Sequence, residues 1–405
     1  MGQVRRGENM QTGPCANRPK TQDLRSKGSD MTKGQTTHGI LKDPTLLVAA
    51  LMADGWRVIG PKVRDQAIVY EVLDQPDDLP RGLTDSQSGG LYRLEAGQPE
   101  RWFDYVVGPH SWKKWLFPAR QKLWTATRLA DAGFEIEVSA IDWPKTVFFG
   151  VRACEIAAMT VQDRVFDNGM FRDAAYAARR ADTLIVAVQC ARSAETCFCA
   201  SMNTGPGVDE GYDIALTELA GISGEILVTA GSDRGRAILA PLALPSATDG
   251  QIAAGPATTA AAAASQSRAM VPDIARVLRE GLDHTNWEVV ADACLSCGNC
   301  TLACPTCFCS DVEDVSDLSG DHAERWRSWD SCFSTDFSYV HGGAVRRSPK
   351  SQYRQWMTHK LSTWHDQFEM SGCVGCGRCI TWCPVGIDIT REAGTFAAHP
   401  HPAET

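Results

Sequence analysis

Two copies of one cysteine motif, both in the last third of this 405-residue chain, constrain its fold more than any other feature. Each copy places four cysteines and a proline in the pattern C-x2-C-x2-C-x3-C-P. The first motif contains Cys294, Cys297, Cys300, Cys304 and Pro305, and the second contains Cys373, Cys376, Cys379, Cys383 and Pro384. Chance would hardly repeat all five positions, so we expect a duplicated metal-binding unit in this segment.

The spacing is that of bacterial ferredoxins with two clusters, in which the fourth cysteine of each run binds the other cluster. Three closely spaced thiolates can reach three irons of one cubane only where the loop turns tightly, and Gly298 and Gly377 permit such turns. Pro305 and Pro384 remove an N–H and end each motif. We therefore predict two [4Fe–4S] clusters, one bound by Cys294, Cys297, Cys300 and Cys383 and the other by Cys373, Cys376, Cys379 and Cys304.

Zinc is the main alternative metal, because zinc sites also use four cysteines. They usually present two C-x-x-C pairs rather than four cysteines in one run before a proline. The pattern thus favours iron–sulfur clusters over a non-redox scaffold stapled by zinc.

A long insert, residues 305–372, separates the two motifs. It contains three more cysteines, Cys307, Cys309 and Cys332, which are either alternative ligands or packed thiols, and we favour packed thiols. Its aromatic side chains, among them Trp326, Phe333, Phe337, Tyr339, Trp356 and Trp364, can shield clusters from water.

The polar residues of the insert are interpreted differently. Its histidines, His322, His341, His359 and His365, are interpreted as solvated or packed. The acids Asp311, Glu313, Asp314, Asp317 and Asp321 form either a docking face or, as is usual for a charge run, a solvated surface.

Residues 41–245 show the pattern of an α/β domain. Pro44 at the first helical position and Gly55 at the end delimit a predicted helix through Leu46 and Leu51. Short β-branched runs predict strands at 67–73, 147–151, 183–188 and 225–229, with helical stretches such as 154–165 between some of them. This order favours a mixed α/β sheet over an all-β sandwich.

Four further cysteines, Cys154, Cys190, Cys197 and Cys199, lie in this α/β segment. Cys154 and Cys190 each follow a predicted strand. Neighbouring parallel strands would bring both thiols to one edge of the sheet, where α/β proteins bind ligands. The four thiols are therefore either a third [4Fe–4S] site or separate buried cysteines, and spacing alone leaves both readings open.

The remaining segments carry less information. Residues 1–40 are polar with few aliphatic side chains and are predicted to be a disordered tail, to which we assign no function at Cys15, and Met10 or Met31 is an alternative start. Residues 246–290, with the alanine run 260–264, are predicted to be a linker that leads into a helix. Residues 396–405 form a second tail. The predicted architecture is an α/β domain (41–245), a helical linker and a ferredoxin-like α+β domain (291–395) with two clusters and a long insert.

Composition excludes several classes of protein. A net charge of −9 argues against nucleic-acid binding. The sequence shows no basic-then-apolar leader and no long apolar run, so we expect neither a secretory signal nor a membrane span. Clustered cysteines in a cytoplasmic chain indicate metal ligands rather than disulfides. Dinucleotide fingerprints, phosphate-binding loops and C-x-x-C-H haem motifs do not occur.

An ordered set of motifs across residues 41–395 resembles a known family. These motifs are GPHSWKKWLFP (108–118), GVRACE (150–155), DRVF (163–166), CFCASMNTGP (197–206), GYDIALTEL (211–219), CGNCTLACPTCFC (297–309), WDSC (329–332) and CVGCGRC (373–379). The chain is similar to the iron–sulfur beta subunit of cytosolic NAD(P)-linked nickel–iron hydrogenases, the sulfhydrogenases. The A subunit of anaerobic sulfite reductase is a close relative of that family.

The resemblance implies a cytoplasmic hetero-oligomer in which this chain is a non-catalytic electron-transfer subunit. Its implied partners are a flavin-containing diaphorase subunit that exchanges electrons with NAD(P)H, a small iron–sulfur subunit and a large nickel–iron subunit. It also favours the third cluster at Cys154, Cys190, Cys197 and Cys199. The sequence does not separate a hydrogenase from a sulfite reductase complex, nor NADH from NADPH.

Overall fold

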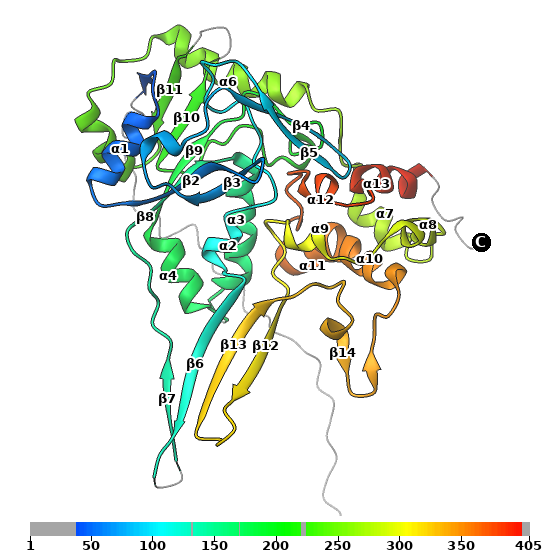
Figure 1. The fold of residues 1–405 in the computed structure, drawn as a ribbon. Coiled ribbons are helices and arrows are strands. Elements are labelled where there is room, and N and C mark those ends of the chain that lie inside the picture. Colours follow the sequence, from blue (N-terminus) through cyan, green and yellow to red (C-terminus); the bar gives the residue numbers. More distant parts are fainter. Residues whose placement is uncertain (1–37, 131–132, 170, 220–223, 399–405) are drawn as a thin grey trace, which may run out of the picture. The chain divides into compact units, whose positions relative to one another are not determined.

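A seven-stranded mixed sheet forms the centre of the N-terminal half (Figure 1). The computed structural model describes residues 38–130, 133–169, 171–219 and 224–398. Residues 1–37 of the predicted tail 1–40, with Cys15, and residues 399–405 of the predicted tail 396–405 lie outside the described residues. The prediction of a tail is wrong for residues 38–40, which belong to strand β1 (His38–Leu41), and for residues 396–398, which end helix α13 (Ile389–Ala398). The sheet contains β1 (His38–Leu41), β11 (Ile226–Ala230), β10 (Ile214–Glu218), β9 (Thr183–Val188), β8 (Thr146–Val151), β2 (Arg57–Arg64) and β3 (Ala67–Val72), in that order. The four central strands, β10, β9, β8 and β2, are parallel.

All four strands predicted from β-branched runs are found in this sheet, as β3, β8, β9 and β11. The predicted helices at the N-terminal end also form, as α1 (Thr45–Ala53) and α3 (Ala153–Phe166). Pro44 precedes α1 as its cap rather than occupying the first helical position. The helices α4 (Ala174–Asp182) and α5 (Asp233–Leu239) also belong to this half. Strand β8 crosses to the parallel β9 through α3 and α4, which is the connection that parallel strands require.

The core of this half consists of side chains from β8 and β9, which are buried along their whole length. Trp112, just before the short helix α2 (Lys113–Leu116), packs between Tyr70 and Phe148 with ring centroids 4.0 and 4.3 Å away. Continuous burial on both faces explains why these strands appear in the sequence as apolar runs without alternation.

A second, four-stranded antiparallel sheet joins the two halves of the chain. Its order is β12 (Ser310–Ser316), β13 (His322–Trp329), β6 (Arg120–Arg128) and β7 (Phe134–Val138). Strands β12 and β13 belong to the insert, where the sequence analysis predicted no strand. These strands are rich in charged residues and are linked by ion pairs such as Arg325–Asp314, so they lack the apolar alternation that predicts strands.

The C-terminal half is mostly helical (Figure 1). Its helices are α6 (Asp249–Ala264), α7 (Ile274–Glu280), α8 (Asn286–Ala293), α9 (Asn299–Leu302), α10 (Pro349–Thr358), a π-helical turn (His359–Thr363), α11 (Trp364–Phe368), α12 (Arg378–Thr381) and α13 (Ile389–Ala398). The alanine run 260–264 forms the end of α6 rather than an irregular linker. Alanine has the highest helix propensity, and Thr248 and Gln251 form a capping box at the start of α6. The domain boundaries at 245 and 290 stay predictions.

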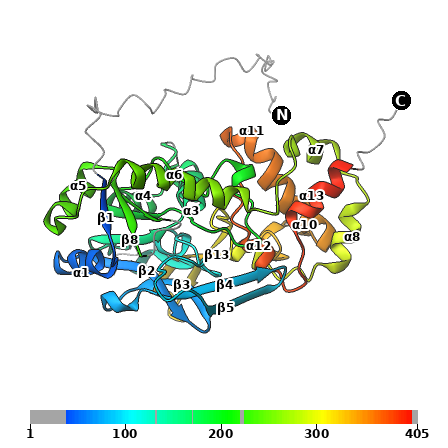
Figure 2. The same ribbon diagram turned by 90° about the horizontal axis from the view of Figure 1, so that it is seen from above.

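A hairpin from the N-terminal half reaches the second motif. It is formed by β4 (Leu83–Ser88) and β5 (Leu91–Ala96), and it lies beside α12 in both ribbon views (Figures 1 and 2). At its turn, the Gly90 N–H donates to the Ile380 carbonyl at 3.2 Å. The buried Gln87 side chain accepts hydrogen bonds from Thr381, at 2.8 Å, and from Thr196, at 3.2 Å. Small elements remain in the short strands β14 (Tyr339–Val340) and β15 (Gly343–Ala344) and in 3₁₀ turns at 76–78, 200–202, 240–242 and 336–338.

Two glycines near helix starts provide a matched test of this packing. A Cβ on Gly235 in α5 would lie 1.9 Å from the Asp213 carbonyl oxygen, whereas a Cβ on Gly250 in α6 would meet only the Thr248 hydroxyl, at 4.0 Å. We expect Gly250→Ala to stabilise the fold by up to ~1 kcal/mol and Gly235→Ala to destabilise it by about 2–3 kcal/mol, because the backbone must move apart. Thermal unfolding followed by circular dichroism measures both, and equal midpoints would contradict this packing.

Candidate metal centres

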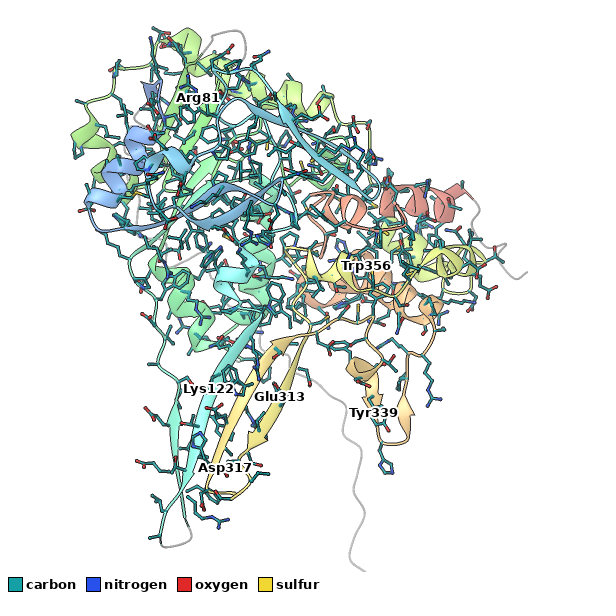
Figure 3. All side chains as sticks on the ribbon, in the orientation of Figure 1. Arg81, Lys122, Glu313, Asp317, Tyr339 and Trp356 are labelled. Carbon is teal, nitrogen blue, oxygen red and sulfur yellow. The ribbon has the colours of Figure 1, made fainter. Side chains whose placement is uncertain are left out.

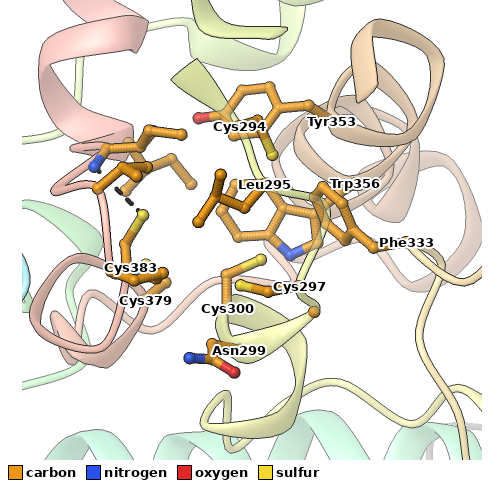
Figure 4. A pocket seen from close by; sticks show the side chains of 15 residues that line it. Cys294, Leu295, Cys297, Asn299, Cys300, Phe333, Tyr353, Trp356, Cys379 and Cys383 are labelled. Atoms are coloured by element: carbon orange, nitrogen blue, oxygen red, sulfur yellow. Dashed lines mark hydrogen bonds between the residues drawn. The ribbon is translucent and has the colours of Figure 1, made fainter. Parts of the chain in front are cut away.

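Cysteines of both motifs line one small hollow in the C-terminal half (Figure 4). The hollow measures about 30 Å³. Its cysteines are Cys294, Cys297 and Cys300 of the first motif with Cys379 and Cys383 of the second. Cys383 follows α12, yet it lies with the first-motif thiols. The rest of the lining is largely apolar and includes Phe333, Tyr353 and Trp356, so the aromatic shielding expected from the insert is present for these three residues.

The backbone around each motif turns as the spacing requires. Gly298 and Gly377 cap α9 and α12 with φ values of 74° and 76°, in the left-handed region that favours glycine. Backbone N–H groups point at three sulfurs: Ser296 N to Cys294 at 3.4 Å, Gly375 N to Cys373 at 3.5 Å, and Ile387 N to Cys383 at 3.3 Å. Such N–H···S contacts stabilise negative charge on sulfur.

The second-motif cysteines lie close to Cys304, the last cysteine of the first motif. Burial, followed by the neighbouring thiolates of Cys373, Cys376 and Cys304, raises the pKa of Cys379. Burial likewise raises the pKa of Cys373 to about 12. The structure thus places Cys304 among the second-motif thiols and Cys383 among the first-motif thiols.

The four cysteines of the α/β half also come together. Cys154 at the start of α3 and Cys190 after β9 lie at the same edge of the sheet, because β8 and β9 are parallel neighbours. With Cys197 and Cys199 they line a hollow of about 30 Å³, together with Cys376 of the second motif.

Polar side chains surround these thiols. Arg152, which is buried, lies with its guanidinium nitrogen Nη1 3.7 Å from the Cys190 sulfur and donates to the Phe103 and Tyr105 carbonyls. Gln266 lies with Nε2 3.2 Å from the Cys199 sulfur. Sequence reasoning missed both residues, although Arg152 is part of the quoted GVRACE motif.

The loop of the second motif packs directly on the loop that carries Cys197 and Cys199. Phe198 N donates to Gly375 O at 2.9 Å, and the Thr204 hydroxyl donates to Val374 O at 2.7 Å. A Cβ on Gly375 would lie 2.7 Å from backbone atoms of Cys199, and one on Gly377 would lie 2.3 Å from Thr196 O. Only glycine permits this approach, so the two cysteine sets are in contact.

A buried ion pair lies at the same contact. Arg378 in α12 pairs with Glu155 in α3, and both side chains are almost fully buried. Burial alone would lower the pKa of Arg378, but Glu155 and the thiolates of Cys376 and Cys154 raise it, so the guanidinium stays charged.

The insert cysteines Cys307, Cys309 and Cys332 line a separate, larger cavity of about 270 Å³. The Cys332 thiol donates a hydrogen bond to Cys309 and lowers the pKa of Cys309 to about 7. The buried Lys360 ammonium lies 3.3 Å from the Cys304 sulfur and 3.5 Å from the Cys307 sulfur. Burial would lower the pKa of Lys360, but these thiolates raise it. Sequence reasoning did not single out Lys360.

The acidic run of the insert lies on β12 and the turn after it. Glu313 pairs with Arg120 at 3.1 Å and Asp314 pairs with Arg325, while Asp317 lies at the far end of the hairpin (Figure 3). These exposed pairs agree with the interpretation of a solvated face. Among the insert histidines, His322, His341 and His365 are exposed, whereas His359 borders the larger cavity.

Two features are absent from the described residues. Within the described ranges, no three His, Cys, Asp or Glu side chains are placed to hold a single metal ion. None of the helices in the described part of the chain combines the length and hydrophobicity needed to span a lipid bilayer.

Comparison with known proteins agrees with the cysteine geometry. Residues 293–387 match the family model of the 4Fe-4S dicluster domain. The chain is also 32% identical over 271 residues to sulfhydrogenase 2 subunit beta of Pyrococcus furiosus, an alignment that covers 65% of this chain and 79% of that protein.

Removing one partner of the buried ion pair should be costly. We expect Arg378→Met to destabilise the chain by about 3–5 kcal/mol, because the Glu155 carboxylate stays buried without its partner. Arg64→Met removes an exposed guanidinium paired with Glu71 and should cost less than ~1 kcal/mol. The double variant Arg378→Met/Glu155→Leu should recover part of the loss. Thermal unfolding measures all three, and equal losses for Arg378 and Arg64 would contradict this role.

Proposed function

The chain belongs to the family of sulfhydrogenase beta subunits, and from this premise we propose that it relays single electrons inside a hetero-oligomeric nickel–iron hydrogenase complex. One partner is a flavin subunit that exchanges electrons with NAD(P)H, and the other is the nickel–iron module, with its small iron–sulfur subunit and its large subunit. When bound, [4Fe–4S] clusters supply one-electron transfer. The residues of this chain bind the clusters, shield them from water and fix the distances between them.

We assign the clusters by the crossed pattern. Cys294, Cys297, Cys300 and Cys383 bind the first, and Cys373, Cys376, Cys379 and Cys304 bind the second. The observation that carries the proposal is the position of the fourth cysteines. Cys383 lines the hollow of the first motif. Cys304 contacts Thr306 and Lys360, which both donate to the carbonyl of Gly372 directly before the second motif. If each cluster takes ligands from both motifs, the two clusters are held side by side, at the short distance that electron transfer needs.

We assign a third cluster to Cys154, Cys190, Cys197 and Cys199. Convergence of four thiols at the edge of a parallel sheet supports this site, because separate packed cysteines would not need a common hollow. The buried Arg152 guanidinium supports it further, since it compensates thiolate charge. Cys376 borders the same hollow, so the third cluster would be next to the second and would extend the path into the α/β half.

Two other functions remain as alternatives to be tested. The A subunit of an anaerobic sulfite reductase would contain the same clusters but assemble with a sirohaem-binding subunit, and the similarity to a sulfhydrogenase subunit favours the hydrogenase. A zinc-stapled scaffold would contain no sulfide, and the match to the 4Fe-4S dicluster domain favours iron. Identification of the polypeptides that co-purify with the full chain separates the two complexes.

Serine variants of the two exchanged cysteines test the crossed ligation. We expect the reduced-state EPR spectrum of Cys304→Ser to match that of Cys376→Ser, because both lose a ligand of the second cluster. The spectrum of Cys383→Ser should match that of Cys297→Ser for the same reason at the first cluster. Matching in the opposite order, with Cys304→Ser resembling Cys297→Ser, would show that each motif binds its own cluster.

Loss of the Cys197 thiol tests the third cluster. After anaerobic purification, Cys197→Ser should contain about four irons and about four sulfides fewer per chain than the unmodified protein. Cys15→Ser removes a cysteine outside the described residues and serves as the control, with unchanged iron. Iron content and an EPR spectrum that are identical in Cys197→Ser and the control would refute the assignment.

A further inference from the structure

The cavity beside the second motif is unlike an ordinary packing defect. Its volume of about 270 Å³ compares with about 30 Å³ for the hollow between the motif cysteines. Three cysteines, Cys307, Cys309 and Cys332, border it, together with Lys360 and His359. The two proposed motif clusters and the proposed α/β cluster use none of these three thiols.

The hairpin β12–β13 brings two of the thiols close together, with Asp330, two residues before Cys332, opposite Cys309. Cys309 directly precedes β12, Cys332 lies three residues after β13, and the pairing of Ser310 with Trp329 sets their register. The Asp330 N–H extends this ladder by donating to the Cys309 carbonyl at 2.9 Å. The Cys332 thiol consequently lies within hydrogen-bonding reach of Cys309. Next to it, the Ser331 hydroxyl is 2.7 Å from that of Thr301, which anchors the segment to the first motif.

Two buried lysines lie against this group of thiols. Lys360 Nζ contacts the sulfurs of Cys304 and Cys307 and also donates to the Thr306 hydroxyl, at 3.0 Å. Lys113 Nζ lies 4.0 Å from the centre of the Trp329 ring and donates to the Thr301 and Leu302 carbonyls. Both side chains are about 5% exposed, and no carboxylate in the described ranges forms an ion pair with either.

Buried ammonium groups need a compensating negative charge. Within this site, thiolates are the anions in reach, and a neutral thiol packed as a small hydrophobic group would not provide the charge. Lys360, with Nζ 3.5 Å from the Cys307 sulfur, thus favours at Cys307 the thiolate, the form in which cysteine binds metals, over a packed thiol.

We propose that Cys307, Cys309 and Cys332 bind an additional iron–sulfur cluster, held beside the second-motif cluster with Lys360 between the two. The inference rests on the proposed assignment of Cys304 to the second-motif cluster, which leaves three protein thiolates for this one. A cubane with three cysteine ligands has one iron that takes a different donor. That donor would come from the cavity that these thiols and His359 line, which has room for a small anionic ligand.

Iron and acid-labile sulfide analysis of the full chain, purified without oxygen, tests the proposal. Cys309→Ser and Cys307→Ser should each lose about four irons and about four sulfides per chain relative to Cys15→Ser. The EPR signals that disappear in Cys376→Ser, Cys297→Ser and Cys197→Ser should all persist in both variants, which shows that the chain is still folded and that the other clusters are intact. Cys307 and Cys309 both line the cavity, and serine differs from cysteine only in the oxygen that replaces the sulfur, so each substitution is a small change in volume.

Three results would overturn the proposal. The first is unchanged iron in both variants, which means packed thiols. The second is a Cys309–Cys332 disulfide, detected by mass spectrometry after alkylation, with unchanged iron, which means a dithiol redox pair. The third is that the metal lost from both variants is zinc and not iron. Each result leaves the motif signals in place, so failure here is distinguishable from failure of the proposed electron relay, in which Cys376→Ser and Cys297→Ser would lose no signal.

Discussion

Compensation of buried sulfur charge is the constraint on which the rest of this structure depends. Fifteen cysteines lie in the described residues, and most of them are buried or half-buried. Thiolates at such positions are unstable unless positive charge or N–H donors lie beside them. The chain supplies Arg152 and Arg378 at the α/β thiols and Lys113 and Lys360 at the insert thiols, each almost fully buried. These four cations are separated in sequence, so the cysteine sites can form only when the two halves fold together.

Close backbone approach between two loops follows from the same constraint. The second-motif loop contacts the Cys197–Cys199 loop at Gly375 and Gly377, where any side chain would overlap the opposite backbone. The buried Gln87 bridges Thr196 and Thr381 across this contact. Because the protein surrounds the contact with hydrogen bonds on both sides, the distance between the cysteine sets is fixed by packing and not by a flexible hinge. Fixed short distances are the property that an electron-transfer subunit needs.

The sequence is most informative where the chemistry dictates the spacing of ligand residues along the chain. The repeated motif predicts the crossed assignment of Cys304 and Cys383, because cluster geometry dictates the spacing within each run. That assignment stays a prediction, and the structure brings Cys383 to the hollow that Cys294, Cys297 and Cys300 line. Buried strands such as β8 and β9 were recognisable as continuous apolar runs. The α/β cysteines could be placed at one sheet edge, but the contacts of Arg152 and Gln266 with their sulfurs, and the approach of Cys376, arise only in the folded chain. Strands β12 and β13 were missed because many of their residues are charged, and β6 because its partner β13 is distant in sequence. Strand β7 was missed although its apolar residues Phe134, Ile136 and Val138 alternate with acids.

The insert was the least predictable segment and is more than a spacer. Its hairpin pairs with β6, whose sequence lies almost 200 positions earlier, so the second sheet contains strands from both halves. The pairing of β12 with β13 brings Cys309 within hydrogen-bonding reach of Cys332, and Trp329 lies against Lys113. Lys113 belongs to the N-terminal half, and its ammonium reaches the carbonyls that end the first motif. A simple insertion could be removed without effect on the motifs, whereas removal of this hairpin would expose Lys113 and separate two thiols, so the insert is an integral part of the metal-binding half.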